Sequence, residues 1–323
     1  MIQIKELARG GAEYRLEPEM RRLVPTSRCW HTGRRNVATR RKRHMAYKTI
    51  LTVLTQAEDV APHLDAILPF ARGEGAHLDI LCLGIDRTRV GYVAADGMTF
   101  ITEESQRLAM ENAEAIREAV NEKMRPEDIT WGAESVLAYS AGLTAVVADR
   151  ARYSDLVAVP KPYGEGADPD APIILEAALF DADVPALVLP NGVEPVLPFK
   201  HAVVGWNERP EAFAAVRAAL PLLIPAEETD IAVVNPERHG SKTADPGEQL
   251  AVWLARHGAK PEVSLVPQTM PTVAQELLRH CRDEGADLLV MGAYGHSRFR
   301  EAILGGATRD MLELTEIPLF LAR

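Results

Sequence analysis

The feature that most constrains the fold is a regular alternation of short apolar runs and longer helical runs, which begins at Met45 and passes along the chain twice. In the first pass, runs rich in Val, Ile and Leu predict strands at 48–54, 77–83, 130–137, 156–159 and 186–189. Helices are predicted between them, at 60–72, 102–123, 142–151 and 172–180. A strand–helix alternation of this kind predicts an α/β fold with a parallel sheet covered on both faces.

The second pass repeats this order. Strands are predicted at 201–206, 230–234, 262–266, 288–291 and 319–321, and helices at 210–223, 246–257, 272–284 and 298–314. Local matches support a duplication, such as Asp155-Leu156 against Asp287-Leu288. The sequence therefore predicts two tandem five-stranded parallel-sheet domains, at 45–190 and 199–323. The linker between them is short and rich in proline, so we expect the two domains to pack closely as a pseudo-dimer.

Charge separates the first 44 residues from the rest. Residues 1–44 carry twelve Lys and Arg against four Glu, a net charge of +8, while the remainder carries 24 basic and 42 acidic side chains, a net charge of −18. We expect residues 1–44 to be a disordered tail, or upstream sequence translated from a misplaced start with Met45 as the true initiator. A patch that binds nucleic acid or an anionic surface is the other interpretation of this segment. The acidic remainder would repel nucleic acid.

The apolar runs and the cysteines indicate the cellular compartment to expect. No stretch approaches the ~18 consecutive apolar residues of a membrane span, and no apolar signal segment is present near the N-terminus. The three cysteines, Cys29, Cys82 and Cys281, are far apart and form no metal-binding or disulfide pattern. We therefore expect a cytoplasmic protein that does not bind a membrane.

One stretch carries a glycine pattern suited to binding phosphate. Gly292, Gly295 and Gly305 are separated by two and nine residues, and Gly306 and Thr308 follow. The first two glycines leave the fourth strand of the second pass at its carboxyl end, where open α/β sheets bind ligands. Glycines there let backbone N–H groups approach a phosphate, and the N-terminus of the last helix favours an anion. The spacing matches neither the P-loop nor G-x-G-x-x-G.

This stretch resembles the signature of the universal stress protein family, in which G-x2-G-x9-G follows the fourth strand and precedes Ser or Thr. The match is carried by Leu-Leu-Val-Met-Gly-Ala-Tyr-Gly-His-Ser-Arg at 288–298. The resemblance implies a tandem pair of Rossmann-like, adenine-nucleotide α-hydrolase-like domains, with ATP and Mg bound in the second. It places the base, ribose and phosphates near nine residues: Asn207, Val234, Met291, Gly292, Gly295, Gly305, Gly306, Ala307 and Thr308.

Two departures from the family pattern affect the expected site. Gly306 stands where Ser or Thr is expected, although Thr308 keeps a hydroxyl nearby. Asn207 replaces an Asp near the adenine, so it can form hydrogen bonds but lacks the charge. Its neighbour Trp206 is expected to be a packing residue, and stacking on the base is the other interpretation. ATP binding in the second domain remains the expectation.

The first domain departs from the family pattern throughout. Pro160 removes an N–H group at the end of the fourth strand, where a phosphate cradle needs one. Glu165, Asp168 and Asp170 would repel phosphate, and no glycine follows at the nine-residue spacing. We expect the first domain to bind no nucleotide and to support the second domain.

The leading hypothesis is a universal stress protein that acts as a nucleotide-responsive module. No catalytic base or lysine finger is evident, so we assign no catalytic or metal-binding residue and expect at most slow ATP hydrolysis. The alternative, of another class, is a scaffold that binds no nucleotide and presents surfaces to a partner protein. Asn207, Gly306 and the degenerate first domain favour it. The sequence leaves open whether the protein is a monomer with an internal pseudo-dimer or a homodimer.

Overall fold

The computed structural model describes residues 46–88, 95–164, 166–190, 192–235, 246–293 and 306–323. The prediction for residues 1–44 therefore lies outside the described residues. In the described part of the chain, no helix combines the length and the apolar character that crossing a membrane requires.

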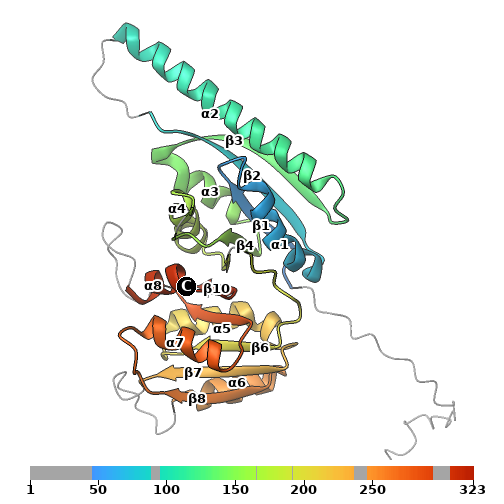
Figure 1. The fold of residues 1–323 in the computed structure, drawn as a ribbon, viewed down its shortest axis with the longest axis vertical. Coiled ribbons are helices and arrows are strands. Elements are labelled where there is room, and N and C mark those ends of the chain that lie inside the picture. Colours follow the sequence, from blue (N-terminus) through green and yellow to red (C-terminus); the bar gives the residue numbers. More distant parts are fainter. Residues whose placement is uncertain (1–45, 89–94, 165, 191, 236–245, 294–305) are drawn as a thin grey trace, which may run out of the picture. The chain divides into compact units, whose positions relative to one another are not determined.

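The first half of the described chain alternates strands and helices (Figure 1): β1 (Thr49–Leu54), α1 (Val60–Glu74), β2 (His77–Asp86), α2 (Ala95–Met124), β3 (Trp131–Tyr139), η2 (Ser140–Gly142), α3 (Leu143–Ala151), β4 (Leu156–Pro160), α4 (Ala171–Glu176), η3 (Ala177–Asp181) and β5 (Ala186–Leu189). The second half repeats the alternation: β6 (His201–Gly205), α5 (Pro210–Leu223), β7 (Glu228–Val234), α6 (Glu248–His257), β8 (Pro261–Val266), α7 (Val273–Asp283), β9 (Leu288–Gly292), α8 (Gly306–Leu314) and β10 (Leu319–Ala322).

The described strands form one sheet, in the order β3-β2-β1-β4-β5-β10-β9-β6-β7-β8. Strands within each half pair in parallel, and the two halves have the same internal order. The halves join through β5 and β10, which pair antiparallel with Leu319 opposite Val188 and Leu321 opposite Ala186. The α/β class and the tandem five-stranded arrangement predicted from the sequence are confirmed.

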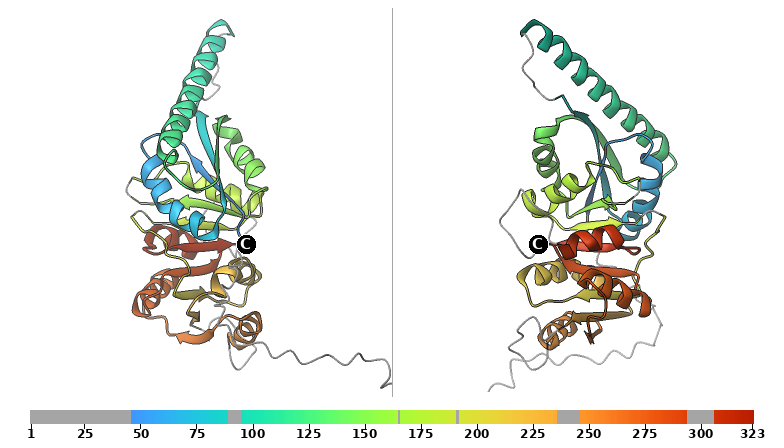
Figure 2. Two further views of the ribbon diagram at one scale, coloured as in Figure 1. Left: turned by 90° about the vertical axis from the view of Figure 1, so that its right-hand side faces the viewer. Right: turned by 60° about the vertical axis from the view of Figure 1, so that its left-hand side comes forward.

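Helices cover both faces of this sheet (Figure 2). Buried side chains of α1, α2, α5 and α6 share one core cluster with the strands, and those of α3, α4, α7 and α8 share the other. Strand residues alternate between the two clusters, as in Ile50 and Leu51 of β1. Because both faces are covered, the strands are apolar along nearly their whole length, which is why they are recognisable in the sequence.

The duplication extends to a matched pair of hydrogen-bonding carboxylates. Asp155, just before β4, accepts the backbone N–H groups of Lys48 and Thr49 at 2.7 and 3.0 Å. Asp287, just before β9, accepts the N–H group of Lys200 at 2.8 Å and that of His201 at 3.0 Å. Each carboxylate therefore ties the start of the fourth strand of its half to the start of the first strand.

Some helices begin at other residues than predicted. α2 begins at Ala95 rather than at 102. α6 begins at Glu248 rather than at 246, because Gly247 has a φ of 97° and cannot be helical. The last helix is described from Gly306, and the predicted residues 298–305 lie outside the described part.

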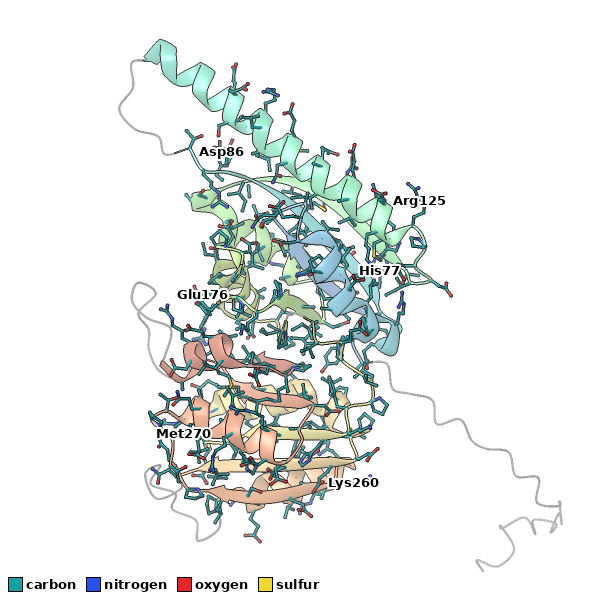
Figure 3. All side chains as sticks on the ribbon, viewed as in Figure 1. His77, Asp86, Arg125, Glu176, Lys260 and Met270 are labelled. Carbon is teal, nitrogen blue, oxygen red and sulfur yellow. The ribbon has the colours of Figure 1, made fainter. Side chains whose placement is uncertain are left out.

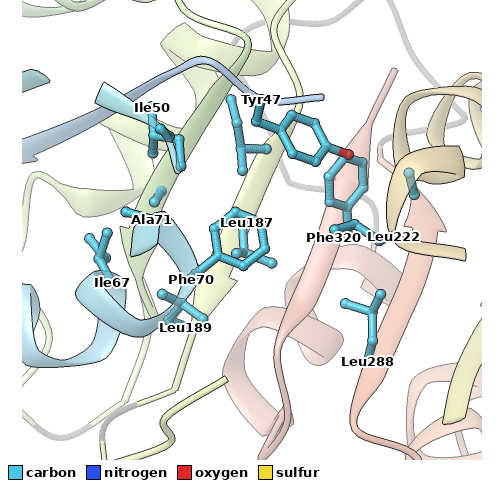
Figure 4. Close-up of a cluster of buried hydrophobic side chains, with 14 of the residues drawn as sticks. Tyr47, Ile50, Ile67, Phe70, Ala71, Leu187, Leu189, Leu222, Leu288 and Phe320 are labelled. Atoms are coloured by element: carbon cyan, nitrogen blue, oxygen red, sulfur yellow. The ribbon is translucent and has the colours of Figure 1, made fainter. Parts of the chain in front are cut away.

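Tyr47 connects the two halves of the protein. Its ring lies 6.2 Å from the ring of Phe320 in β10 and 6.2 Å from that of Phe70 in α1 (Figure 4). Its hydroxyl donates a hydrogen bond of 2.7 Å to the carbonyl of Ala218 in α5. Burial, followed by the charges of Glu74 and Asp155, raises the pKa of Tyr47 well above its ordinary value, so the hydroxyl stays protonated and donates.

We expect Tyr47→Phe to lower the free energy of unfolding by about 1 kcal/mol, because it removes one buried hydrogen bond and keeps the ring. Urea-induced unfolding of both proteins measures the difference. Tyr47→Ala, which also removes the ring from the core, should cost about 3–5 kcal/mol. Equal stabilities of Tyr47→Phe and the parent protein would contradict a stabilising role for the hydroxyl.

Candidate functional site

The order of strands reverses at β6, which lies between β7 and β9 and runs parallel to both. The chain leaves β6 toward α5 and leaves β9 toward α8, and these helices belong to opposite core clusters. In open parallel sheets such a point leaves a crevice beyond the carboxyl ends of the strands, and ligands bind there. Gly205 of β6 pairs with Met291 of β9, so the two strands end at the same level. Asn207 and Gly292, both predicted site residues, therefore lie at the carboxyl ends of these two neighbouring strands.

Gly292 is held close to the start of α5. A Cβ atom on Gly292 would lie 2.5 Å from the backbone nitrogen of Ala212 and 2.5 Å from the carbonyl carbon of Glu211. These are backbone atoms, which cannot give way as the end of a flexible side chain can. The glycine predicted to admit a phosphate is thus required, within the described structure, by the contact between β9 and α5.

Asn207 lies in the exposed loop between β6 and α5. Its side-chain oxygen accepts the backbone N–H group of Arg209 at 3.1 Å, which fixes the turn into α5. This leaves the side-chain NH₂ group as the part that can donate to a ligand. Trp206 packs edge-on against Phe213, with ring centroids 6.2 Å apart and an interplanar angle of 73°. The structure therefore shows Trp206 in a packing contact.

The two apolar residues predicted near the base differ in exposure. Val234, the last residue of β7, is 3% exposed and belongs to the core. Met291 is partly buried and packs against the same core cluster. Any contact of the β7 end with a base would therefore come from the backbone or from Asn235, which follows.

The remaining predicted residues lie at the start of α8. Gly306 is the first residue of this helix, Ala307 is exposed and Thr308 is 5% exposed. Gly295 and Gly305 lie outside the described residues. The structure thus places Gly292, the first glycine of the motif, at the end of β9, and Gly306, which follows the motif, at the N-terminus of α8.

Glu211, which no sequence motif marks, lies in the first turn of α5 beside Gly292. Its Oε2 atom is inaccessible to solvent and has no hydrogen-bond partner within the described structure. A buried carboxylate oxygen is an acceptor that calls for a donor. The only signal in the sequence was its distance of four residues from Asn207.

Comparison with known families decides the identity of this half. Residues 198–323 match the model of the universal stress protein family. The C-terminal half of the chain is a universal stress domain. The family resemblance drawn from the glycine motif is thereby confirmed for this half.

The universal stress fold extends over both halves. The structure of a universal stress protein from Archaeoglobus fulgidus has a TM-score of 0.57 at 17% identity and covers 85% of this chain and 96% of its own. A protein of unknown function from Pseudomonas aeruginosa has a TM-score of 0.51 at 15% identity, with 86% of this chain and 93% of its own covered. At these identities the likeness establishes the fold alone.

A relative from Synechocystis, described as a universal stress protein, is 37% identical over 70 residues. The matched stretch is 22% of this chain and 23% of the relative, so the chain matches less than a quarter of that protein's length.

In the first half the strand order reverses at β1. Polar side chains of the first half lie at this place and contact one another. Thr55, just beyond β1, donates through its hydroxyl to the carboxylate of Asp168. Asp170 forms an ion pair with Arg87, which follows β2. Glu165 lies outside the described residues. Asp168 and Asp170, which were predicted to repel phosphate, are thus engaged in contacts within the first half. Arg87 directly follows Asp86, the last residue of β2 (Figure 3).

Proposed function

We propose that the universal stress domain at 199–323 binds an adenine nucleotide beyond the carboxyl ends of β6 and β9, and that the protein acts as a nucleotide-responsive module in the stress response. One observation carries the proposal: Gly292 ends β9 where the strand order reverses, and Gly306 begins α8. The two glycines therefore lie at a strand end and a helix N-terminus, which are the two backbone settings that bind phosphate. Membership of the family supports the same site.

Charge in the described residues supports one orientation of the nucleotide. The backbone of Glu211 lies beside Gly292 at the end of β9, so the charge of this residue would disfavour phosphate at that end. The N-terminus of α8, by contrast, favours an anion. We therefore place the phosphates toward α8, and the ribose and base toward α5. Glu211 would accept a hydrogen bond from a ribose hydroxyl or the amino group of the base.

The amide of Asn207 fits the base end of this orientation. Its oxygen is occupied by the N–H group of Arg209, so it offers a donor. Adenine ring nitrogens are acceptors, and an amide donor pairs with them without carrying charge. The replacement of Asp by Asn is therefore compatible with an adenine ligand.

Magnesium would arrive with the nucleotide. Within the described residues, no group of three His, Cys, Asp or Glu side chains converges to hold a metal ion. Mg²⁺ commonly binds through substrate phosphates and retained waters, where it neutralises phosphate charge. The residues of this chain would then hold the nucleotide, chiefly through backbone donors.

A thermal-shift measurement with Mg-ATP tests the proposal, using substitutions at Ala307. This residue is exposed and second in α8, so Ala307→Asp should leave the fold intact, because an acidic residue is favourable in a first helical turn. The new carboxylate should nevertheless repel the phosphates. Binding should raise the melting temperature of the parent protein by about 2–4 °C for each kcal/mol of stabilisation.

The control is Ala307→Asn, which has nearly the same shape without the charge and should keep the shift. Loss of the shift in Ala307→Asp alone supports phosphate binding at α8. The absence of any shift in the parent protein at millimolar Mg-ATP would overturn the proposal. That result would favour the alternative, a scaffold that binds no nucleotide. The first half also supports this alternative, because its own side chains fill the corresponding place.

A further inference from the structure

We propose that Tyr163, in the first half, is a positioning residue for the site in the second half, because it holds the N-terminal turn of α8. The inference rests on the proposed function for its effect on nucleotide binding. It gives the first half a specific role in place of the nucleotide site that this half has lost.

The contact joins the loop after β4 to the first turns of α8. The guanidinium carbon of Arg309 lies 5.3 Å from the centroid of the Tyr163 ring, a cation–π distance. Arg309 follows Thr308, so the contact acts next to the helix end at which we place the phosphates. The Tyr163 ring is partly buried and packs against the core cluster that also contains Met311 and Leu312 of α8.

The loop that presents Tyr163 is anchored at both ends. The N–H group of Lys161 donates to the carbonyl of Leu189 in β5 at 3.2 Å. At the other end, Asp168 accepts from Thr55 of the β1 end, and its second oxygen accepts the N–H group of Asp170 at 2.9 Å.

Between these anchors the loop turns back on itself. The N–H group of Ala167 donates to the carbonyl of Gly164 at 3.3 Å, and Gly164 and Gly166 have φ of 118° and 74°. Ion pairing of Asp170 with Arg87 ties the loop to the end of β2 as well. A loop fixed in this way can hold a side chain against a neighbouring helix without paying much ordering entropy when the contact forms.

This loop occupies the same place in the first half as the glycine-rich stretch does in the second, since each follows the fourth strand of its half. Pro160 and the two aspartates, which make it unsuitable for phosphate, are the residues that end β4 and anchor the loop. We infer that the loop has exchanged ligand binding for support of α8.

The chain supplies a matched control for this contact. Arg323, which follows β10, lies with its guanidinium carbon 4.7 Å from the ring centroid of Phe180 in η3. This is also an arginine–aromatic contact between the second and the first half, but it involves no residue of α8. Tyr163→Leu and Phe180→Leu remove the same chemistry at the two places, and Tyr163→Phe keeps the aromatic face at the first.

The first experiment measures the dissociation constant for Mg-ATP by titration calorimetry on the full chain. We expect Tyr163→Leu to weaken binding about two- to five-fold, as the loss of one exposed cation–π contact would. Tyr163→Phe and Phe180→Leu should match the parent protein. Equal weakening in Tyr163→Leu and Phe180→Leu, or no weakening in either, would overturn the inference.

The second experiment needs no ligand and separates this inference from the proposed function. Hydrogen exchange of the backbone amides at 310–313, which donate to the carbonyls of the first turn of α8, should be faster in Tyr163→Leu than in the parent protein and unchanged in Phe180→Leu. Arg309→Gln, which removes the contact from the other side, should reproduce the faster exchange. If the parent protein does not bind Mg-ATP, the proposed function fails, while exchange still decides whether Tyr163 positions α8. Unchanged exchange in both Tyr163→Leu and Arg309→Gln would overturn the positioning role.

Discussion

Gly84→Ala should lower the free energy of unfolding by about 3 kcal/mol or more. A Cβ atom on Gly84 would lie 1.7 Å from the carbonyl oxygen of Ala109 and 2.5 Å from its carbonyl carbon. Both are backbone atoms of α2, so the helix itself would have to move away from β2. That movement would loosen the core packing of three buried side chains of the same helix, Ala113, Ile116 and Val120.

Gly132→Ala is the matched control, because this glycine lies in the neighbouring strand β3 and has no backbone atom near its absent Cβ. The nearest atoms are the ends of the His77 and Asp79 side chains, at 3.6 and 3.8 Å. Alanine also loses less backbone entropy on folding than glycine, so this variant should be as stable as the parent protein or slightly more stable. Urea unfolding compares the three proteins. Equal stabilities of Gly84→Ala and Gly132→Ala would show that α2 does not approach β2 as closely as described.

Acidification should destabilise the protein through His63. Burial lowers the pKa of this α1 side chain from 6.5 to about 4, and its ring contacts the hydroxyl of Thr52. That hydroxyl donates to the carbonyl of Ala158 at 2.9 Å, so the ring nitrogen of neutral His63 must donate to Thr52. Below pH 6.5 the unfolded chain protonates this histidine while the folded protein does not. The contribution of His63 to the free energy of unfolding is therefore fully present above pH 6.5. It falls by about 3 kcal/mol as the pH drops to 4.

His63→Gln isolates this effect, since glutamine can donate to Thr52 but does not titrate. We expect the difference in unfolding free energy between parent and variant to change between pH 6.5 and 4 and to be flat above that range. All other titrating groups are shared, so they cancel in the difference. A difference that does not vary with pH would contradict a buried neutral His63.

The buried carboxylate of Glu276 affects stability at lower pH than His63 does. Burial alone would raise the pKa of Glu276, but it accepts the N–H groups of Met270 and Thr269, at 2.7 and 2.6 Å, and is held by Arg279. These bonds outweigh burial and lower its pKa to about 2. Its contribution is present above pH 4.5 and lost as the pH falls toward 2, so it overlaps the His63 range only between pH 4 and 4.5.

The elements that could be predicted from the sequence are those buried on both faces. The apolar runs of β1 and β9 have few other structures available, and repeated pairs such as Asp155 and Asp287 identify the duplication. Helix starts are harder to predict, because α2 begins beside Asp96 and Gly97, two poor helix formers, so propensity gives no sharp signal there. The start of α6 is set by the φ of Gly247, which depends on its packing against Val263 and Ile231.

Residues of the candidate site could be predicted where a sequence motif contains them. Residues whose role depends on tertiary contacts could not be predicted. Gly292 was predicted as a residue near phosphate, but its contact with α5 comes from tertiary packing. Glu211 and Tyr163 carry no motif at all. Their importance arises from an unpartnered oxygen and from an arginine more than a hundred residues further along the chain. Such pairings become visible only when the fold brings the residues together.

The antiparallel pairing of β5 with β10 determines how the joined sheet depends on protein concentration. Were the two halves separate molecules, this pairing would form by association, and the fraction joined would fall as the protein became scarce. Here both strands belong to one chain, and a short linker keeps each at a high effective concentration for the other. The ten-stranded sheet, and any support that the first half gives to the second, should therefore persist at the lowest copy number of the protein.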